Sequence, residues 1–383
     1  MAKMDIYVVQ PGDTLDSIAE AFGVSAERLY WDNDLENPDS LVTGQTIVIA
    51  YPEQTHTVSE GDTLEGIAAF YGITVMQLLR NNPTLANDMA IYSGETLIIS
   101  YPTIGRIATH GYTYTYINPV VLKKTLPSLT YLTIFNYRST GEGEVIAFYD
   151  DTDIIRIAKQ YGVVPLMMVT TLTAQGIPNM DIANNILSNI EYQERHIGNI
   201  LNILHAQGYY GVNIVLNFLN KQNQELYFEF LQRIYERLHS EGYLCFVTVN
   251  TDISSTDDNI IFDRIDYSQI SSWIDGIIFI HFIWGSNAGP PAPVSSAANL
   301  NAYLDYVTMV LSPDKVIAGS SIISYVWPLP YIPGTTTAYS LTINSALSLA
   351  RDLKVEIQFD ERSQTPFFQY SQFIFGAPIQ HIA

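Results

Sequence analysis

Residues 208–218 read Gly-Tyr-Tyr-Gly-Val-Asn-Ile-Val-Leu-Asn-Phe, and this stretch indicates the fold of the larger part of the chain. Its glycines form a tight turn, and the apolar, β-branched run that follows is typical of a fully buried strand. Amphipathic helical patterns flank it, at 181–204 before it and at 225–238 after it. Helix–strand–helix is one repeat of a parallel α/β barrel, so we expect the α/β class.

Other apolar runs beyond residue 102 continue this pattern, and helical patterns such as 154–161 and 300–311 separate most of them. This alternation predicts a right-handed barrel of the TIM type, with any site at the C-terminal ends of its strands. The expected strands are 107–117, 129–137, 163–171, 212–218, 244–250, 276–282 and 315–325.

The first hundred residues contain an internal repeat. The turn Gly-Asp-Thr-Leu begins at Gly12 and again at Gly61, and each copy closes near a later glycine, Gly44 or Gly94. Each copy has the pattern strand, capped helix, helix, strand. The sequence therefore predicts two small βααβ modules, 1–52 and 53–102, in front of a large domain at 103–383.

The charge is strongly acidic: 39 Asp and Glu against 18 Lys and Arg give a net charge of −21. This disfavours nucleic acid and anionic lipid as partners, and a solvated acidic surface accounts for it without a function. No apolar run reaches the roughly 18–20 residues of a membrane span. The chain runs straight into a strand, so we expect no signal peptide. The one cysteine, Cys245, lies in an apolar strand, which predicts a buried thiol and no intrachain disulfide.

Five carboxylates gather after the second expected strand of the large domain. They could form a rescue acid pair or a weak Ca²⁺ site, but their run-like spacing predicts a solvated loop, so we expect no metal and no cofactor. They are Glu142, Glu144, Asp150, Asp151 and Asp153.

The repeat resembles the LysM module, over nearly its whole length and in both copies. LysM modules bind N-acetylglucosamine-containing glycans, such as peptidoglycan or chitin, in a groove between the first strand–helix turn and the loop before the last strand. For Asp13 and Asp62 we favour a role in the turn alone, with backbone groups contacting sugar. The implied contacts are Gly12, Asp13, Thr14 and Leu15 with Pro38, Asp39, Ser40 and Leu41, and Gly61, Asp62, Thr63 and Leu64 with Ala90, Ile91 and Tyr92.

The large domain resembles glycoside hydrolase family 18, the chitinase-like barrels, and in particular the spore cortex-lytic enzymes that carry LysM modules in front of the barrel. Gly-Pro-Pro at 289–291 and Trp-Pro-Leu-Pro-Tyr at 327–331 match that subgroup. The family's strand carries D-x-x-D-x-D-x-E, whose Glu is the proton donor. Here Tyr210, Asn213, Val215 and Asn217 take those four places, and the spore subgroup is also Asn-like at the second.

These replacements oppose the family's mechanism, in which the N-acetyl oxygen of the sugar attacks and one carboxylic acid protonates the leaving oxygen. The Asn217 amide has no such proton to give, and Val215 cannot steady the developing cation. Loss of the acid costs roughly 10²–10⁴ in rate, and loss of a charge stabiliser costs on the order of 10²–10³. We therefore expect a catalytically silent barrel.

The sixth expected strand departs from the family as well. Its M-T-Y-D motif lies over Ile280, His281, Phe282 and Ile283, so the tyrosine hydroxyl and the aspartate are both replaced. His281 is interpreted as a core residue.

The C-terminal part is expected to form a helix at 343–353, a strand at 355–359 and an aromatic, hairpin-like piece at 367–375. These resemble the small α+β insertion of the family. The family's last helix and eighth strand are not visible, which predicts a degenerate or incomplete barrel with two unpaired sheet edges. Truncation, an open barrel and closure in trans in an assembly are the alternatives.

Three functions follow. The first is a non-catalytic structural protein of the spore coat or cell wall, made without export in the mother cell of a sporulating Gram-positive bacterium, which binds glycan through LysM modules and self-associates. The second is an N-acetylglucosaminidase of peptidoglycan or chitin type with residual or non-standard catalysis. The third is a lectin-like barrel, with Trp273, Trp284 and Trp327 as stacking platforms. The first is our prediction.

Overall fold

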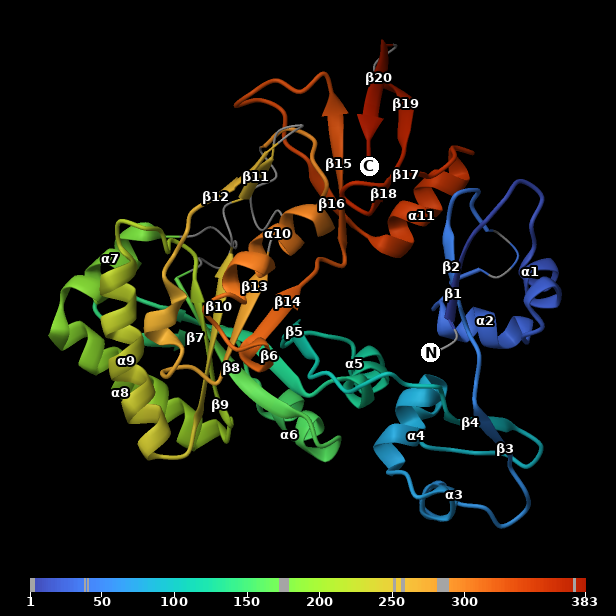
Figure 1. Ribbon diagram of the computed structural model, residues 1–383, viewed down its shortest axis with the longest axis horizontal. Coiled ribbons are helices and arrows are strands. Elements are labelled where there is room, and N and C mark those ends of the chain that lie inside the picture. Colours follow the sequence, from blue (N-terminus) through green and yellow to red (C-terminus); the bar gives the residue numbers. More distant parts are fainter. Residues whose placement is uncertain are drawn as a thin grey trace.

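A computed structural model describes residues 4–37, 39, 41–171, 179–250, 253–255, 259–280, 289–374 and 377–383 (Figure 1). The chain forms two N-terminal modules, a curled parallel sheet covered by helices, and a small α+β unit made by residues 323–383. The two-module, α/β organisation predicted from the sequence is confirmed.

Each N-terminal module has the order strand, helix, helix, strand. Module 1 (residues 1–52) contains β1 (Met4–Val8), α1 (Leu15–Phe22), α2 (Ala26–Asp32) and β2 (Thr46–Ala50), and module 2 (residues 53–102) contains β3 (Gln54–Thr57), α3 (Leu64–Tyr71), α4 (Val75–Asn81), η1 (Pro83–Ala86) and β4 (Thr96–Ser100). Thr14 and Thr63 cap α1 and α3. The side chain of each threonine accepts a hydrogen bond from the backbone N–H group three residues further along the chain. Both helices end at a glycine in the left-handed region, Gly23 or Gly72.

The large domain is built on parallel strands in the order β14-β13-β10-β9-β8-β6-β5, with the short β7 (Val145–Ala147) antiparallel to β6. The strands are β5 (His110–Tyr114), β6 (Tyr131–Ser139), β8 (Val164–Thr170), β9 (Gly211–Leu216), β10 (Leu244–Asn250), β13 (Gly276–Ile280) and β14 (Val316–Gly319). In the described part of the chain, β5 and β14 each pair on one side only. The sheet is therefore a curled half-barrel with two edges, as the sequence predicted.

Helices connect these strands and cover the outer face of the sheet (Figure 1). They are α5 (Pro119–Thr125), η2 (Leu126–Ser128), α6 (Thr152–Gln160), α7 (Met180–Ser188), α8 (Ile190–Gln207), α9 (Gln224–Ser240), η3 (Tyr267–Ile270), α10 (Ala297–Val307) and η4 (Pro313–Lys315). After β10, the small strands β11 (Ile253–Ser255) and β12 (Ile260–Phe262) pair with each other in antiparallel fashion. No helix in the described ranges is both long and apolar enough for a membrane crossing.

Two expected elements are each divided in the structure. The helix expected at 181–204 is interrupted at Asn189, which has extended backbone and whose side chain caps α8 by accepting from the N–H groups of Glu191 and Tyr192. The strand expected at 315–325 ends at Gly319, because Ser320 and Ser321 break the apolar run. Its second half belongs to β15 (Ile323–Leu329), which lies in a different sheet.

The α+β unit has β15 in a four-stranded antiparallel sheet with β16 (Tyr339–Thr342), β19 (Gln369–Ile374) and β20 (Ala377–Ile382). α11 (Ile343–Asp352) packs on it, and β17 (Gln358–Asp360) pairs with β18 (Thr365–Phe367). The helix and the aromatic strands predicted here are confirmed, although the strand expected at 355–359 starts three residues later.

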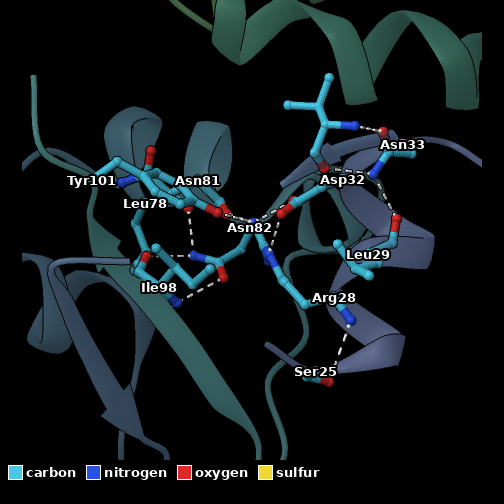
Figure 2. A network of polar contacts seen from close by, with 11 residues as sticks. Ser25, Arg28, Leu29, Asp32, Asn33, Leu78, Asn81, Asn82, Ile98 and Tyr101 are labelled. Atoms are coloured by element: carbon cyan, nitrogen blue, oxygen red, sulfur yellow. Dashed lines mark hydrogen bonds and ion pairs between the residues drawn. The ribbon is translucent and has the colours of Figure 1, made fainter. Parts of the chain in front are cut away.

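The modules are packed onto the rest of the molecule. The core of module 2 continues into the core of the large domain as one apolar cluster, and the Tyr161 hydroxyl donates to the Ala86 carbonyl. Between the modules, Arg28 donates to the Asn81 carbonyl and to the Tyr101 hydroxyl, both at 2.7 Å (Figure 2). It also pairs with Asp32, whose pKa is nevertheless raised because burial of the carboxylate outweighs the attraction of Arg28.

Candidate functional site

Strand β9 presents alternate residues to opposite sides of the sheet. Val212, Ile214 and Leu216 lie in the apolar cluster beneath the helices. Because side chains alternate along a strand, Asn213 and Val215 face the barrel interior, and Asn217 follows on the same side just beyond the strand end. The three positions that the family motif assigns to acidic residues thus lie on one face, from the middle of the strand to just beyond its C-terminal end.

Asn213 lies in a buried polar network inside the barrel. Its amide nitrogen donates to the Tyr112 hydroxyl at 3.1 Å and to Thr133 Oγ1 at 3.2 Å, and its amide oxygen accepts from Thr248 Oγ1 at 2.8 Å. Burial raises the pKa of Tyr112 to about 12. These contacts join strands β5, β6, β9 and β10 across the interior, so Asn213 has a structural role.

Asn217 lines a pocket of about 180 Å³ at the C-terminal ends of β9 and β10. It is half-buried, and its amide nitrogen lies 3.4 Å from Thr170 Oγ1. The described lining of this pocket contains a single carboxylate, Asp263, which is exposed. Two tyrosines in its wall, Tyr267 and Tyr303, are buried and share a 2.7 Å hydrogen bond between their hydroxyls. Pattern reasoning missed Asp263, because it lies on no expected strand.

The other positions of the barrel motif do not join this pocket. Tyr210 precedes β9 at the opposite end of the strand and is 52% exposed, with Lys159 Nζ 5.2 Å from its ring centre. His281, Phe282, Ile283 and Trp284 lie outside the described residues. The remaining predicted positions, 213, 215 and 217, share the interior face.

The tryptophans expected to stack on sugar have other surroundings where they are described. Trp327 is buried in the α+β unit beside Tyr325, and its indole N–H donates to the Gly289 carbonyl at 3.0 Å. Trp273 is half-buried and packs against the main core. Neither lies in the lining of the Asn217 pocket.

Asp151 corrects the prediction of a solvated carboxylate loop. It is 2% exposed and accepts hydrogen bonds from the Tyr137 and Tyr209 hydroxyls, each at 2.6 Å, and from Asn136 Nδ2 at 3.0 Å. The pKa values of both tyrosines are raised, first by burial and then by the neighbouring carboxylate. By contrast Glu142, Glu144, Asp150 and Asp153 are exposed, as expected.

No group of three or more His, Cys, Asp or Glu side chains that could hold a metal ion occurs among the described residues. Cys245 is buried, as predicted, and burial raises the pKa of its thiol.

The Gly-Asp-Thr-Leu turns of the two modules have the same internal bonding. Asp13 accepts from the Tyr7 hydroxyl at 2.6 Å and from the Gln10 N–H at 2.7 Å, and these bonds lower its pKa. Asp62 accepts a hydrogen bond from the Ser59 N–H at 2.7 Å, and its Oδ2 atom lies 2.9 Å from His56 Nε2. These two contacts lower the pKa of Asp62. Both carboxylates are thus engaged within their turns.

The remaining implied groove residues differ in accessibility. Gly12, Thr14, Gly61, Thr63, Asp39 and Tyr92 are exposed, Leu41, Ala90 and Ile91 are half-buried, and the side chains of Leu15 and Leu64 lie in the module cores. Leu15 and Leu64 can therefore offer only backbone groups to a ligand. Pro38 and Ser40 lie outside the described residues.

A second turn, at residues 42–45 and 92–95, lies beside the Gly-Asp-Thr-Leu turn in each module; we name it the closing turn. In module 1, Val9 N donates to the Gln45 carbonyl and Gly44 N to the Val9 carbonyl, both at 2.9 Å. In module 2, Val58 forms the same pair of bonds with Glu95 and Gly94, both at 2.8 Å.

Comparison with known families decides what the modules are. The LysM domain family matches residues 7–50 and 56–100. Both modules are LysM domains. The match begins within the first strand of each module and runs to the end of its last strand.

The chain is homologous to spore cortex-lytic proteins along its length. The cortical fragment-lytic enzyme of Bacillus subtilis strain 168 is 28% identical over 374 residues, which cover 96% of this chain and 86% of that protein. The crystal structure of the spore cortex-lytic enzyme SleL from Bacillus megaterium QM B1551 superposes with a TM-score of 0.75 at 27% identity, covering all of this chain and 89% of that one.

The large domain also has the chitinase fold. A chitinase from Chromobacterium violaceum ATCC 12472 superposes with a TM-score of 0.61 at 17% identity, over 72% of this chain and 86% of that one. At this identity the likeness concerns the fold alone.

Proposed function

We propose that this chain is a non-catalytic protein of the bacterial spore envelope that binds N-acetylglucosamine-containing glycan through its LysM domains and has a structural role. The LysM domains and the named activity of the cortex-lytic relatives support the glycan and the spore setting. The loss of catalysis rests on one observation, the residues on the interior face of β9.

Asn213, Val215 and Asn217 occupy that face where the family motif has carboxylates. Asn217 reaches the pocket at the strand ends, but an amide can donate only a hydrogen bond and cannot release a proton to a leaving oxygen. Val215 offers no charge to an oxocarbenium ion. Together these residues support a barrel that retains its architecture and has lost its acid.

Sedimentation with purified peptidoglycan tests both halves of the proposal. We expect the full chain to sediment with the polymer while the supernatant stays free of new muropeptides. Failure to sediment contradicts the glycan-binding role, whereas released muropeptides contradict the loss of catalysis.

Self-association is the structural role that the half-barrel supports. β14 and β5 each lack a partner on one side within the described residues, and such edges pair readily with other chains. Light scattering is expected to give a mass above the 42.9 kDa of one chain. Ala318 is an exposed residue of β14, so Ala318→Lys places a charge on this edge strand and should lower the measured mass. A wild-type chain that is monomeric contradicts self-association.

A residual glycosidase is the second candidate, and the position of Asp263 favours it. This carboxylate is in the same pocket as Asn217 and Asn250, at the end of the barrel where family 18 enzymes react. If Asp263 donates the proton, Asp263→Asn abolishes any turnover of chitooligosaccharides, while glycan binding by the LysM domains persists. Turnover that survives Asp263→Asn excludes this acid.

A further inference from the structure

The closing turns of the two LysM domains have the same backbone design. In module 1, Val42 N donates to Gln45 Oε1 at 3.1 Å and Gln45 N donates back to the Val42 carbonyl at 2.9 Å. In module 2, Tyr92 N donates to Glu95 Oε2 at 2.9 Å and Glu95 N to the Tyr92 carbonyl at 3.1 Å. Val42 and Tyr92 are therefore equivalent positions, and so are Gly44 and Gly94.

The closing turn of module 1 is covered by the α+β unit (Figure 1). Val42 is 6% exposed and packs in a cluster with Val326, Ile357 and other residues of that unit. The Thr43 carbonyl accepts from Ile357 N at 3.0 Å. At Gly44 the backbones approach so closely that an added Cβ atom would lie 1.9 Å from the Ile357 carbonyl oxygen. The closing turn of module 1 is therefore an internal joint.

The closing turn of module 2 is open. Tyr92 is 66% exposed, and a Cβ atom added at Gly94 would meet nothing within 4 Å. The facing turn is open as well, because Gly61 and Thr63 are exposed. An exposed aromatic ring with a polar tip is the kind of surface on which a sugar ring stacks.

The last residue of each closing turn, Gln45 or Glu95, is consistent with one turn being covered and the other open to solvent. Gln45, a neutral amide, is buried, whereas its counterpart Glu95, a carboxylate, is exposed. Burial of a carboxylate without a charged partner is costly, so the module 1 turn suits a dry interface and the module 2 turn suits solvent. The difference between Gln45 and Glu95 is a second observation, separate from the difference in exposure between Val42 and Tyr92.

We propose that module 2 alone carries glycan binding, with Tyr92 as the aromatic contact for an N-acetylglucosamine residue, and that the closing turn of module 1 serves as the joint to the α+β unit. The inference rests on the proposed glycan-binding function and gives it a location. It assigns different roles to two LysM domains for which the sequence pattern predicts the same role.

Titration of the full-length chain with chitotetraose, followed calorimetrically, tests this assignment. We expect one site per chain, and a loss of affinity of about tenfold or more in Tyr92→Ala, as for an anchoring aromatic residue. Tyr92→Phe, which keeps the ring, should stay within about threefold of the wild type. Because Tyr92 is exposed, the far-UV circular dichroism of both variants should be unchanged.

Val42→Ala is the matched variant in module 1. It should leave the chitotetraose affinity unchanged and lower the melting temperature, since it removes a packed side chain from the joint. Two equivalent sites, or an unchanged affinity in Tyr92→Ala, would overturn the assignment to module 2 while the glycan-binding function stands. If the wild-type chain binds neither chitotetraose nor peptidoglycan, the proposed function falls, and this inference with it.

Discussion

At the scale of single residues, a buried carboxylate organises the outer layer of the barrel. Asp151 joins the Tyr137 and Tyr209 hydroxyls to Asn136 between β6 and the turn before β9. It lies in a run of acidic residues of which the others are exposed, and composition does not distinguish it from them. Its burial depends on tyrosines far away in the sequence, so a local pattern could not predict it.

Asp151→Ala should destabilise the fold by about 3 kcal/mol, because charge-assisted hydrogen bonds are lost and two buried hydroxyls lose their acceptor. Asp153→Ala is the control: Asp153 is exposed and forms only a surface ion pair with Arg156, so we expect a change within about 0.5 kcal/mol. Urea unfolding measures both. Equal midpoints for the two variants would mean that the network contributes little.

The interior histidine predicts a pH dependence. His110 is surrounded by the rings of Tyr112, Tyr131 and Phe246, and its Nε2 lies 2.6 Å from Thr133 Oγ1. Burial lowers its pKa from 6.5 to about 3. The unfolded chain therefore binds this proton more readily than the folded chain, so the stabilisation is complete above pH 6.5 and declines as the pH falls toward 3.

Between pH 6 and pH 5, this one histidine should reduce the free energy of unfolding by about 1.4 kcal/mol per pH unit. His196, whose pKa burial lowers to about 4, acts in the same direction. His110→Gln should remove the contribution of His110 and leave that of His196. Denaturant unfolding at several pH values measures the slope, and an unchanged slope in His110→Gln would show that the imidazole is not buried in its neutral form.

At the scale of elements, apolar runs were sufficient to predict the strands of the curled sheet, because strands buried on both faces appear as nearly continuous hydrophobic segments. The division between β14 and β15 was not predictable in this way, because apolar residues resume after two serines. Which sheet β15 joins depends on its pairing with β16 and β20, which is tertiary information.

The equivalent glycines of the closing turns provide an element-scale test. Gly44 and Gly94 have φ angles of 84° and 95°, so alanine costs about 1–2 kcal/mol of backbone strain at either position. Only Gly44 also touches the Ile357 backbone. Gly44→Ala should therefore lower the melting temperature clearly more than Gly94→Ala in calorimetry. Equal losses would indicate that module 1 does not dock on the α+β unit in solution.

The β9 site can be tested by restoring its carboxylates. Val215→Asp with Asn217→Glu should not bring back turnover, because Phe282 and Ile283 also differ from the family's sequence motif. The measurement is release of reducing ends from chitooligosaccharide, with the folded state of the double variant checked by circular dichroism. Appreciable turnover would show that these two residues alone account for the loss.

At the scale of the whole molecule, the LysM domains are joined to the barrel in different ways. Module 2 shares its core with the barrel, and module 1 contacts the α+β unit from the other end of the chain. Arg28 links the two modules (Figure 2). The sequence predicted the two domains, since each repeat is local. It could not show that Val42 meets Ile357, because no local pattern connects residues so far apart.

The central claim is that the chain binds glycan through its LysM domains and that its barrel does not cut it. The most direct measurement is prolonged incubation of the full chain with chitotetraose and with cortex muropeptides in ¹⁸O-labelled water, followed by mass spectrometry. Hydrolysis places one labelled oxygen at each new reducing end, so even a few turnovers are visible. We predict no labelled product from a chain that binds the glycan. Labelled product that increases with protein concentration and disappears in Asp263→Asn would contradict the claim and identify a working glycosidase.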